Sequence, residues 1–509
     1  MQQYRMEELI FSGAEPSGSQ AQVDLAVTFT FGEREVTVKG FYAGNGVYKA
    51  RFLPLEAGEY RWRASGCICA EGVLTAEPAP EGVHGPVRAE GTRFVFADGT
   101  AYHPFGTTVY ALVHQDEALI DRTMASLKQS PFNKVRLCVF PKHYDYNHNE
   151  PAHYPFERDE QGRWDVHRPC FAYWDALEAR LGQLSAMGIQ ADLILFHPYD
   201  RWGFDAMPQQ DNLVYLDYLL RRLSAMPDVW WSLANEYDLS GKTLKQWEQI
   251  EQFVADGDPF GHMLSCHNCF RFWDFSQPNV THASIQSKLP HKLDLWRRKY
   301  GKPVVLDECG YEGNLRHFWG SLSGQEMTSR FWMAAAAGAY CTHGETFLDE
   351  ENQIVWWSRG GELKGESAPR IAFLRNIIES LPGHLEGMPT FLEPFVVPHE
   401  AREAAIARMP HLKDFIGAFC RMDEEEQREF MASEFTHQGH IGETCFLWYY
   451  VQRCCAEDVL RLPEGKKYRV EVIDAWNMTR RTVAKGVCGE VRIELPGRPY
   501  IAVLAQAEE

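Results

Sequence analysis

The feature that most constrains the fold is a regular alternation of short apolar strands with amphipathic helices through the middle of the chain. Eight segments qualify as strands: Phe105–Val109, Lys134–Phe140, Gln190–Phe196, Val229–Ala234, His262–Cys266, Val280–Ser284, Pro303–Asp307 and Ala339–Thr342. Helical periodicity falls between them, most clearly in Cys170–Met187, Leu213–Met226, Thr243–Val254 and Glu326–Ala337. Eight strands with intervening helices predict a (β/α)8 barrel. An open doubly wound sheet is the alternative, although the chain has neither of the glycine-rich nucleotide-binding motifs that such sheets often carry.

Segments with a strand pattern also precede this central region. Four segments alternate apolar with polar residues, as expected for the strands of a small β-sandwich: Ala21–Thr30, Arg34–Val38, Val47–Phe52 and Tyr60–Arg63. The stretch Ala76–Gly91 is rich in Pro and Gly, which places the end of the sandwich there. A hairpin at Arg93–Tyr102 follows, turning at an Asp-Gly pair.

The C-terminal region returns to strand patterns after a segment of mixed signals. The last helix of the central region is predicted at Pro369–Glu379, and the mixed segment runs to about Phe415. Strands are then predicted at Glu443–Val451, Lys467–Asp474, Arg480–Ala484 and Glu490–Leu504. The sequence therefore predicts three domains: a β-sandwich at 1–88, the barrel at 89–382, and a linker with a second β-sandwich at 383–509.

Composition narrows the classes of partner. The formal net charge is −19, so the surface repels phosphate backbones and anionic membranes, and we expect neither nucleic acid nor a membrane as a partner. The N-terminal residues MQQYRMEELI lack the features of an export signal, and the 13 scattered cysteines suit a reducing compartment. We therefore expect a cytoplasmic protein. Its oligomeric state, including a homo-oligomer, is left open.

Two glutamates follow two of the predicted barrel strands. The fourth strand ends in Asn235-Glu236 and the seventh in Asp307-Glu308. Reacting groups of (β/α)8 barrels lie at the C-terminal ends of the strands, and strands three apart face each other across the barrel mouth. Two carboxyl groups placed there can flank one scissile glycosidic bond, one as nucleophile and one as acid and then base. The alternative is that each glutamate caps a helix or pairs with a lysine.

Other strand ends are also polar. Arg136 in the second strand could keep a neighbouring carboxyl group ionised. Further polar residues at strand ends could bind sugar hydroxyls around a pocket: His197, His267, Asn268, His282, His343 and Glu345. A set of His, Asp and Glu can instead bind zinc, but the H-x-H common to such barrels is missing near the first strand, which reads FGTTVY. We therefore predict no metal and no cofactor.

At Asn235-Glu236 and Glu308 the pattern resembles clan A of the glycoside hydrolases. The segment FYAGNGVYKARFLPLEAGEYRWRASG, residues 41–66, resembles an N-terminal β-sandwich domain of unknown function that precedes some of these barrels. ADGTAYHPFGTTVYALVHQ, residues 97–115, resembles the start of apiosidase-like barrels, and GESAPRIAFLRNIIES, residues 365–380, resembles their end. The C-terminal β-domain is similar to that of uncharacterised members of the same three-domain group.

The resemblance implies roles for individual residues. Glu236 matches the acid/base and Glu308 the nucleophile, while Asn235 matches the residue that bonds the 2-hydroxyl of the sugar. Arg136 matches an arginine that supports the nucleophile, and His282 stands where many clan members have a histidine or tyrosine near it. The eighth strand departs from the usual pattern. Glu345 occupies the region of the common platform tryptophan, and Trp356 and Trp357 come later in the chain. We predict that Trp357 binds the substrate, and the choice of the ring that stacks on the sugar stays open.

Together these residues predict a retaining β-glycosidase that is exo-acting or cleaves oligosaccharides, with a small glycoside as substrate. Release of apiose is one activity that the resemblance allows. Two alternatives stay open: a catalytically inactive carbohydrate-binding protein on a barrel scaffold, and a metal-dependent barrel hydrolase. The sugar, the linkage and the choice between exo and endo action are not disclosed by the sequence.

Overall fold

The computed structural model of the chain describes residues 1–350, 356–388, 403–404, 406–407, 409–434 and 437–508. These residues form two compact units. Unit 1 comprises Met1–Glu90, Phe94–Gln286 and Gly344–Lys364, and unit 2 comprises Gly91–Arg93, Ser287–His343 and Gly365–Glu509. Part of the predicted linker, residues 389–402, lies outside the described residues. No helix in the described part of the chain is long and apolar enough to cross a membrane.

Unit 1 begins with the predicted β-sandwich. One sheet has the order β1-β5-β4 and contains β1 (Glu7–Ser12), β4 (Phe41–Tyr42) and β5 (Val47–Phe52). The other has the order β3-β2-β6-β7 and contains β2 (Leu25–Phe31), β3 (Arg34–Lys39), β6 (Gly58–Gly66) and β7 (Ala70–Ala76). Alternate side chains of these strands point inward, as in the stacked pair Phe29 and Phe52, whose ring centroids are 4.0 Å apart. The sandwich prediction is confirmed, although β1, β4 and β7 were not expected.

Eight parallel strands form the central barrel, as predicted. They are β11 (Phe105–Thr108), β12 (Lys134–Cys138), β15 (Gln190–Phe196), β16 (Val229–Ala234), β17 (Leu264–Ser265), β18 (Ala283–Gln286), β19 (Val304–Glu308) and β21 (Tyr340–His343), in the order β17-β16-β15-β12-β11-β21-β19-β18. The strands are buried almost throughout because helices cover them, which explains their continuous apolar runs. Two differ from the prediction: β17 is only two residues long, and β18 begins three residues later than expected.

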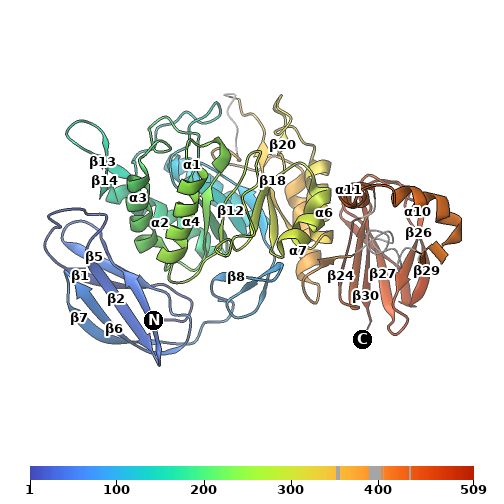
Figure 1. Cartoon of the computed structure of the whole chain (residues 1–509), viewed down its shortest axis with the longest axis horizontal. Helices are drawn as coiled ribbons and strands as arrows, with labels where there is room; N and C mark the ends of the chain where they lie inside the picture. Colours follow the sequence, from blue (N-terminus) through green and yellow to red (C-terminus); the bar gives the residue numbers. More distant parts are fainter. Residues whose placement is uncertain (351–355, 389–402, 405, 408, 435–436, 509) are drawn as a thin grey trace. The chain divides into compact units, whose positions relative to one another are not determined.

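Helices follow seven of the eight barrel strands. They are α1 (Glu117–Gln129), α2 (Phe171–Ala186), α3 (Gln209–Leu223), α4 (Leu244–Gly257), α5 (Leu293–Tyr300), α6 (Gly324–Ala336) and α7 (Ser367–Glu379). Of these, α2, α3, α4 and α6 overlap the four segments in which helical periodicity was clearest. Several begin at a residue suited to capping; the hydroxyl of Thr243 and the side chain of Gln246, for example, form a reciprocal capping box on α4. Helices α3 and α4 pack against each other (Figure 1). A hairpin with the strands β8 (Val87–Glu90), β9 (Arg93–Phe96) and β10 (Ala101–Tyr102) precedes the first barrel strand.

The C-terminal part of unit 2 is rich in antiparallel strands, as predicted. It contains the helices α10 (Lys413–Phe419) and α11 (Glu424–Glu434) and two sheets, with the orders β23-β24-β25-β30-β27-β28 and β26-β29. Their strands are β23 (Glu386–Gly387), β24 (His437–Ile441), β25 (Cys445–Tyr449), β26 (Glu457–Leu462), β27 (Tyr468–Asp474), β28 (Thr479–Val487), β29 (Gly489–Glu494) and β30 (Ile501–Ala507). The predicted strand Glu490–Leu504 is in fact two strands, because a Pro-Gly pair at Pro496-Gly497 interrupts it.

Candidate active site

The fourth barrel strand ends at a strained glutamate. The backbone N–H of Asn235 still donates to the carbonyl of Phe196 in the neighbouring strand, at 2.9 Å. The next residue, Glu236, has left-handed backbone angles, φ 55° and ψ 55°. A residue with a Cβ avoids this region unless its surroundings hold it there. A short 3-10 helix, η2 (Tyr237–Leu239), follows, and the N–H of Tyr237 donates to the carbonyl of His267 at 3.0 Å. The turn therefore carries Glu236 on a fixed backbone.

Three side chains donate hydrogen bonds to the Glu236 carboxyl group, which is buried with its residue only 6% exposed. The hydroxyl of Tyr199 donates to Oε2, as does Nδ2 of Asn235 at 3.4 Å. The side-chain amide of Gln286 donates to Oε1 at 3.2 Å. Both oxygens are thus held, and the orientation of the carboxyl group is set before any substrate binds. Neither Tyr199 nor Gln286 was predicted from the sequence.

Asn268 acts on this carboxyl group through Gln286. Its Oδ1 accepts the backbone N–H of Gln286 at 3.1 Å, and its Nδ2 donates to the carbonyl of the same residue at 3.1 Å. The prediction placed Asn268 at the end of the fifth strand as a sugar-binding group. The structure confirms its place, but its amide is occupied by the end of β18, so Asn268 positions Gln286.

Aromatic rings surround the neighbouring Asn235. The hydroxyl of Tyr110 donates to Oδ1 of Asn235 at 3.1 Å. Trp357 packs edge-on against Tyr110, with ring centroids 5.8 Å apart, and against Tyr144 at 5.2 Å. Its backbone carbonyl accepts the N–H of Tyr110 at 3.0 Å. Trp357, which the sequence singled out, therefore belongs to the same cluster as Asn235.

The predicted histidines differ in where they lie. His197 follows β15 and is 3% exposed; burial and the charge of Lys142 lower its pKa to about 3, so its ring is neutral and Nε2–H donates to the carbonyl of Phe140 at 3.1 Å. His267 is fully buried beside the turn of Glu236, where its backbone N–H donates to the carbonyl of Ala234. Both residues lie at C-terminal strand ends, as predicted.

The structure places His282 away from Glu236. Because β18 begins only at Ala283, His282 precedes the strand, four positions before Gln286. Its ring contacts the rings of Trp230 and Phe94, and Trp230 is the second residue of β16. His282 therefore lies toward the N-terminal ends of the strands, opposite to the end that carries Glu236, and we correct its predicted place beside the reacting groups.

Glu308 and Arg136 occupy the expected strand positions. Glu308 is the last residue of β19 and is partly exposed, and its backbone carbonyl accepts the N–H of Ser287 at 2.9 Å. Arg136 lies in β12 and is fully buried. Its Nε is 3.5 Å from Oδ2 of Asp192, an oxygen that also receives Nζ of Lys134 at 2.8 Å. Asp192 on β15 thus compensates part of the positive charge inside the barrel.

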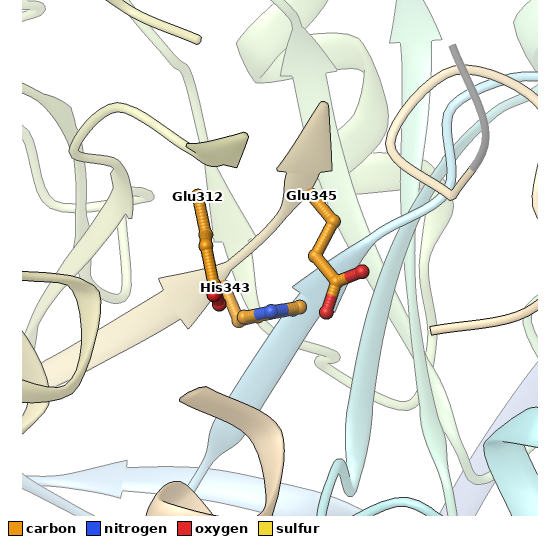
Figure 2. A group of neighbouring side chains, drawn as sticks. All are labelled: Glu312, His343 and Glu345. Carbon is orange, nitrogen blue, oxygen red and sulfur yellow. The ribbon is translucent and has the colours of Figure 1, made fainter. Parts of the chain in front are cut away.

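One group of side chains in the described residues has a donor set that suits a metal ion. Glu312, His343 and Glu345 are all buried and each offers one atom within 4.8 Å of the others (Figure 2). Both oxygens of Glu312 already accept hydrogen bonds at the start of α7, from the backbone N–H groups of Glu366 and Ser367 and the hydroxyl of Ser367. Oε2 of Glu345 accepts the N–H of Lys364 at 2.7 Å. These bonds hold the Glu312 carboxylate and one oxygen of Glu345 in place, and we assign no metal to the group.

Glutamates thus follow the fourth and seventh strands of the eight-stranded parallel barrel, the two positions that the resemblance to clan A of the glycoside hydrolases implies. Comparison with protein families agrees. Residues 89–383, more than half of the chain, match the catalytic domain of the apiosidase-like family, and the chain belongs to that family. Residues 1–66 match the domain of unknown function DUF5060, and residues 435–506 match the domain of unknown function DUF5605.

Solved structures place the chain in the same class. A Bacteroides vulgatus protein that carries a provisional glycoside hydrolase name is 34% identical, with a TM-score of 0.86, and the match covers 100% of this chain and 99% of that one. A glycoside hydrolase of family 5 from the same organism has 12% identity and a TM-score of 0.60, covering 84% of this chain and 94% of its own; it shows the fold alone. No curated protein sequence matches the chain. The relatives support a glycosidase function.

Proposed function

We propose that the protein is a retaining β-glycosidase that acts on small glycosides through Glu236 and Glu308. The observation that carries the proposal is the state of Glu236: a strained backbone at the end of β16 with three side-chain donors on its two carboxyl oxygens. A fold tolerates such strain where a side chain must be held in one orientation. Glu308 at the end of β19 supplies the second carboxyl group of the pair.

In the proposed reaction Glu308 attacks the anomeric carbon and Glu236 protonates the departing glycosidic oxygen. The covalent glycosyl-enzyme is then hydrolysed by a water whose proton Glu236 takes up. Asn235 bonds the 2-hydroxyl of the sugar. Its Oδ1 accepts from Tyr110 and one hydrogen of Nδ2 is directed at Glu236, which leaves the second hydrogen of Nδ2 for that hydroxyl. Arg136 supports the nucleophile, as the family resemblance implies.

The proposal extends to the groups that bind the substrate and to the division into domains. Five buried residues are proposed to contact the sugar: His197, His267, His343, Glu345 and Trp357. A cytoplasmic location would favour short glycosides over polymers. The β-sandwich at 1–88, the barrel at 89–382 and the linker with a second sandwich at 383–509 are proposed as separate domains. The family matches at 1–66, 89–383 and 435–506 support that division.

The test is covalent trapping. A panel of 2,4-dinitrophenyl 2-deoxy-2-fluoroglycosides is incubated with the protein, and the labelled peptide is identified by mass spectrometry. The fluorine slows hydrolysis of the glycosyl-enzyme, so we expect one label per chain, on Glu308. The Glu308→Gln variant should take no label and have no turnover. Binding of a sugar without any label across the panel would instead favour an inactive carbohydrate-binding protein.

A second measurement distinguishes the proposed glycosidase from a metal-dependent hydrolase. The group Glu312, His343 and Glu345 offers metal-type donors, but backbone and hydroxyl groups hold the two carboxylates. We expect dialysis against EDTA to leave the activity unchanged. Loss of activity that added zinc restores would contradict the proposed mechanism.

A further inference from the structure

A buried lysine lies among aromatic side chains next to Glu236. Lys142 follows β12, is 2% exposed, and its backbone carbonyl accepts Nδ2 of Asn147 at 2.7 Å. Its ammonium nitrogen lies over four rings, with distances to the ring centroids of 3.7 Å for Tyr110, 4.2 Å for Tyr199, 4.9 Å for Tyr144 and 5.7 Å for Trp357. We call these four residues the aromatic cage.

The contacts of Lys142 with the cage are of the cation–π type. An ammonium group is attracted to the negative face of an aromatic ring, and the attraction grows where water is excluded. The two shortest contacts, to Tyr110 and Tyr199, are well inside the usual limit of about 6 Å. A positive charge over a phenol ring also withdraws electron density from it, which makes the hydroxyl a stronger hydrogen-bond donor.

These two tyrosines are the ones that reach the proposed acid/base. Tyr199 donates to Oε2 of Glu236, and Tyr110 donates to Asn235, whose Nδ2 donates to the same oxygen. The single ammonium group of Lys142 is thus connected to the Glu236 carboxyl group by two routes, each through one tyrosine. The neighbouring His197 is neutral, so the positive charge beside the aromatic cage comes from Lys142.

We propose that Lys142 is a positioning residue, which orients Tyr110 and Tyr199 so that the Glu236 carboxyl group is held in the orientation from which it protonates the leaving group. The inference rests on the proposed function, because it assumes that Glu236 protonates the leaving group. It predicts an effect on one step in particular, the departure of leaving groups that need a proton. A lysine that only filled space among the rings would have no such selectivity.

The experiment compares leaving groups. The phenyl, 4-nitrophenyl and 2,4-dinitrophenyl glycosides of the sugar that labels Glu308 are assayed with the wild-type chain and with Lys142→Met, which keeps the length of the side chain and removes its charge. We expect kcat/KM to fall about tenfold or more for the phenyl glycoside and less than about threefold for the 2,4-dinitrophenyl glycoside, since a good leaving group needs little protonation. In Lys142→Met, kcat/KM should therefore depend more steeply on the pKa of the leaving group than in the wild-type chain.

Lys134→Met is the matched control. Lys134 is the first residue of β12, the strand that Lys142 follows. It is fully buried, lies over the ring of Trp230 at 5.4 Å and pairs with Asp192. Loss of its charge should lower the melting temperature and leave the dependence on the leaving group unchanged. A steeper dependence in Lys134→Met as well would show that any buried charge has this effect, and would overturn the inference.

Tyr199→Phe keeps the ring under the ammonium group and removes the hydroxyl, so it should steepen the dependence on its own. Adding Lys142→Met should then steepen it only by way of Tyr110, so the two changes should be less than additive. An unchanged dependence in Tyr199→Phe overturns the inference even if Lys142→Met does not fold. Equal losses of Lys142→Met on all three glycosides also overturn it. A wild-type chain that cleaves no glycoside and takes no label overturns the proposed function itself, and the inference with it.

Discussion

The side-chain amide of Asn268 forms two hydrogen bonds to the backbone of Gln286. Its Oδ1 accepts the N–H of Gln286 and its Nδ2 donates to the carbonyl, each at 3.1 Å. The Gln286 side chain in turn donates to Oε1 of Glu236. The pair therefore connects the ends of β17 and β18 to the carboxyl group after β16.

The first prediction concerns this connection. Asn268→Ala removes both bonds, so the end of β18 and the Gln286 amide lose their fixed place. We expect kcat to fall about tenfold with a smaller change of KM, because the loss is in the orientation of Glu236. Gln286→Ala should give a loss of similar size, and the double variant should lose little more than either single one. Fully additive losses in a steady-state assay would show that the two residues act separately.

The second prediction concerns the proposed acid/base. Glu236→Ala removes the proton donor, so glycosides with poor leaving groups should be slowed about a hundredfold or more, and those with good leaving groups much less. The measurement is kcat/KM across a series of aryl glycosides. Equal losses across the series would tell against this assignment of Glu236.

The sequence predicted the strand ends well and the groups between them poorly. Glu236 and Glu308 could be found because each directly follows a continuous apolar run, and the end of such a run marks the mouth of the barrel. Tyr199 and Lys142 come from loops after strands, and an apolar pattern carries no information on where a loop side chain points. Nothing in the spacing of the residues indicated that these two would contact each other.

The sixth strand shows how a small error of register moves a whole site. VTHASIQ alternates too weakly to set its own limits, and a start at Val280 in place of Ala283 put His282 near the mouth of the barrel. The observed start puts Gln286 there. Three residues of a strand span roughly 10 Å. The error in the start of β18 therefore explains both why His282 was misplaced and why Gln286 was missed.

The third prediction concerns stability in unit 1. Arg51 of the N-terminal sandwich forms two hydrogen bonds to Glu178 of α2, at 2.7 Å and 2.9 Å, and Arg222 of α3 bonds the same carboxylate. Burial alone would raise the pKa of Glu178, but the hydrogen bonds and charges of the two arginines outweigh it and lower the pKa. Glu178→Gln leaves the two buried arginines without this anion. It should lower the free energy of unfolding by about 3 kcal/mol at pH 7.

The pH dependence of that loss follows from the lowered pKa. A carboxyl group with a lower pKa in the folded state contributes its stability above its unfolded pKa, and the contribution disappears as the pH falls through the folded value. The difference in urea midpoint between the wild type and Glu178→Gln should therefore be large at pH 7 and shrink in acid. Glu117→Gln is the control, because Glu117 also pairs with an arginine, Arg180, but its side chain is 75% exposed. It should change the midpoint only slightly at either pH.

The last prediction separates the strain at Glu236 from its chemistry. Its φ of 55° lies in the left-handed region, which costs a residue with a Cβ roughly 1–2 kcal/mol and costs glycine nothing comparable. Glu236→Gly and Glu236→Ala lose the same carboxyl group, but only the glycine relieves the strain. We expect both variants to be similarly slow toward glycosides with poor leaving groups, and Glu236→Gly to have the higher melting temperature of the two. Since glycine ordinarily destabilises a folded chain relative to alanine by its greater freedom when unfolded, a higher melting temperature for Glu236→Ala would show that the left-handed backbone is not retained at this residue.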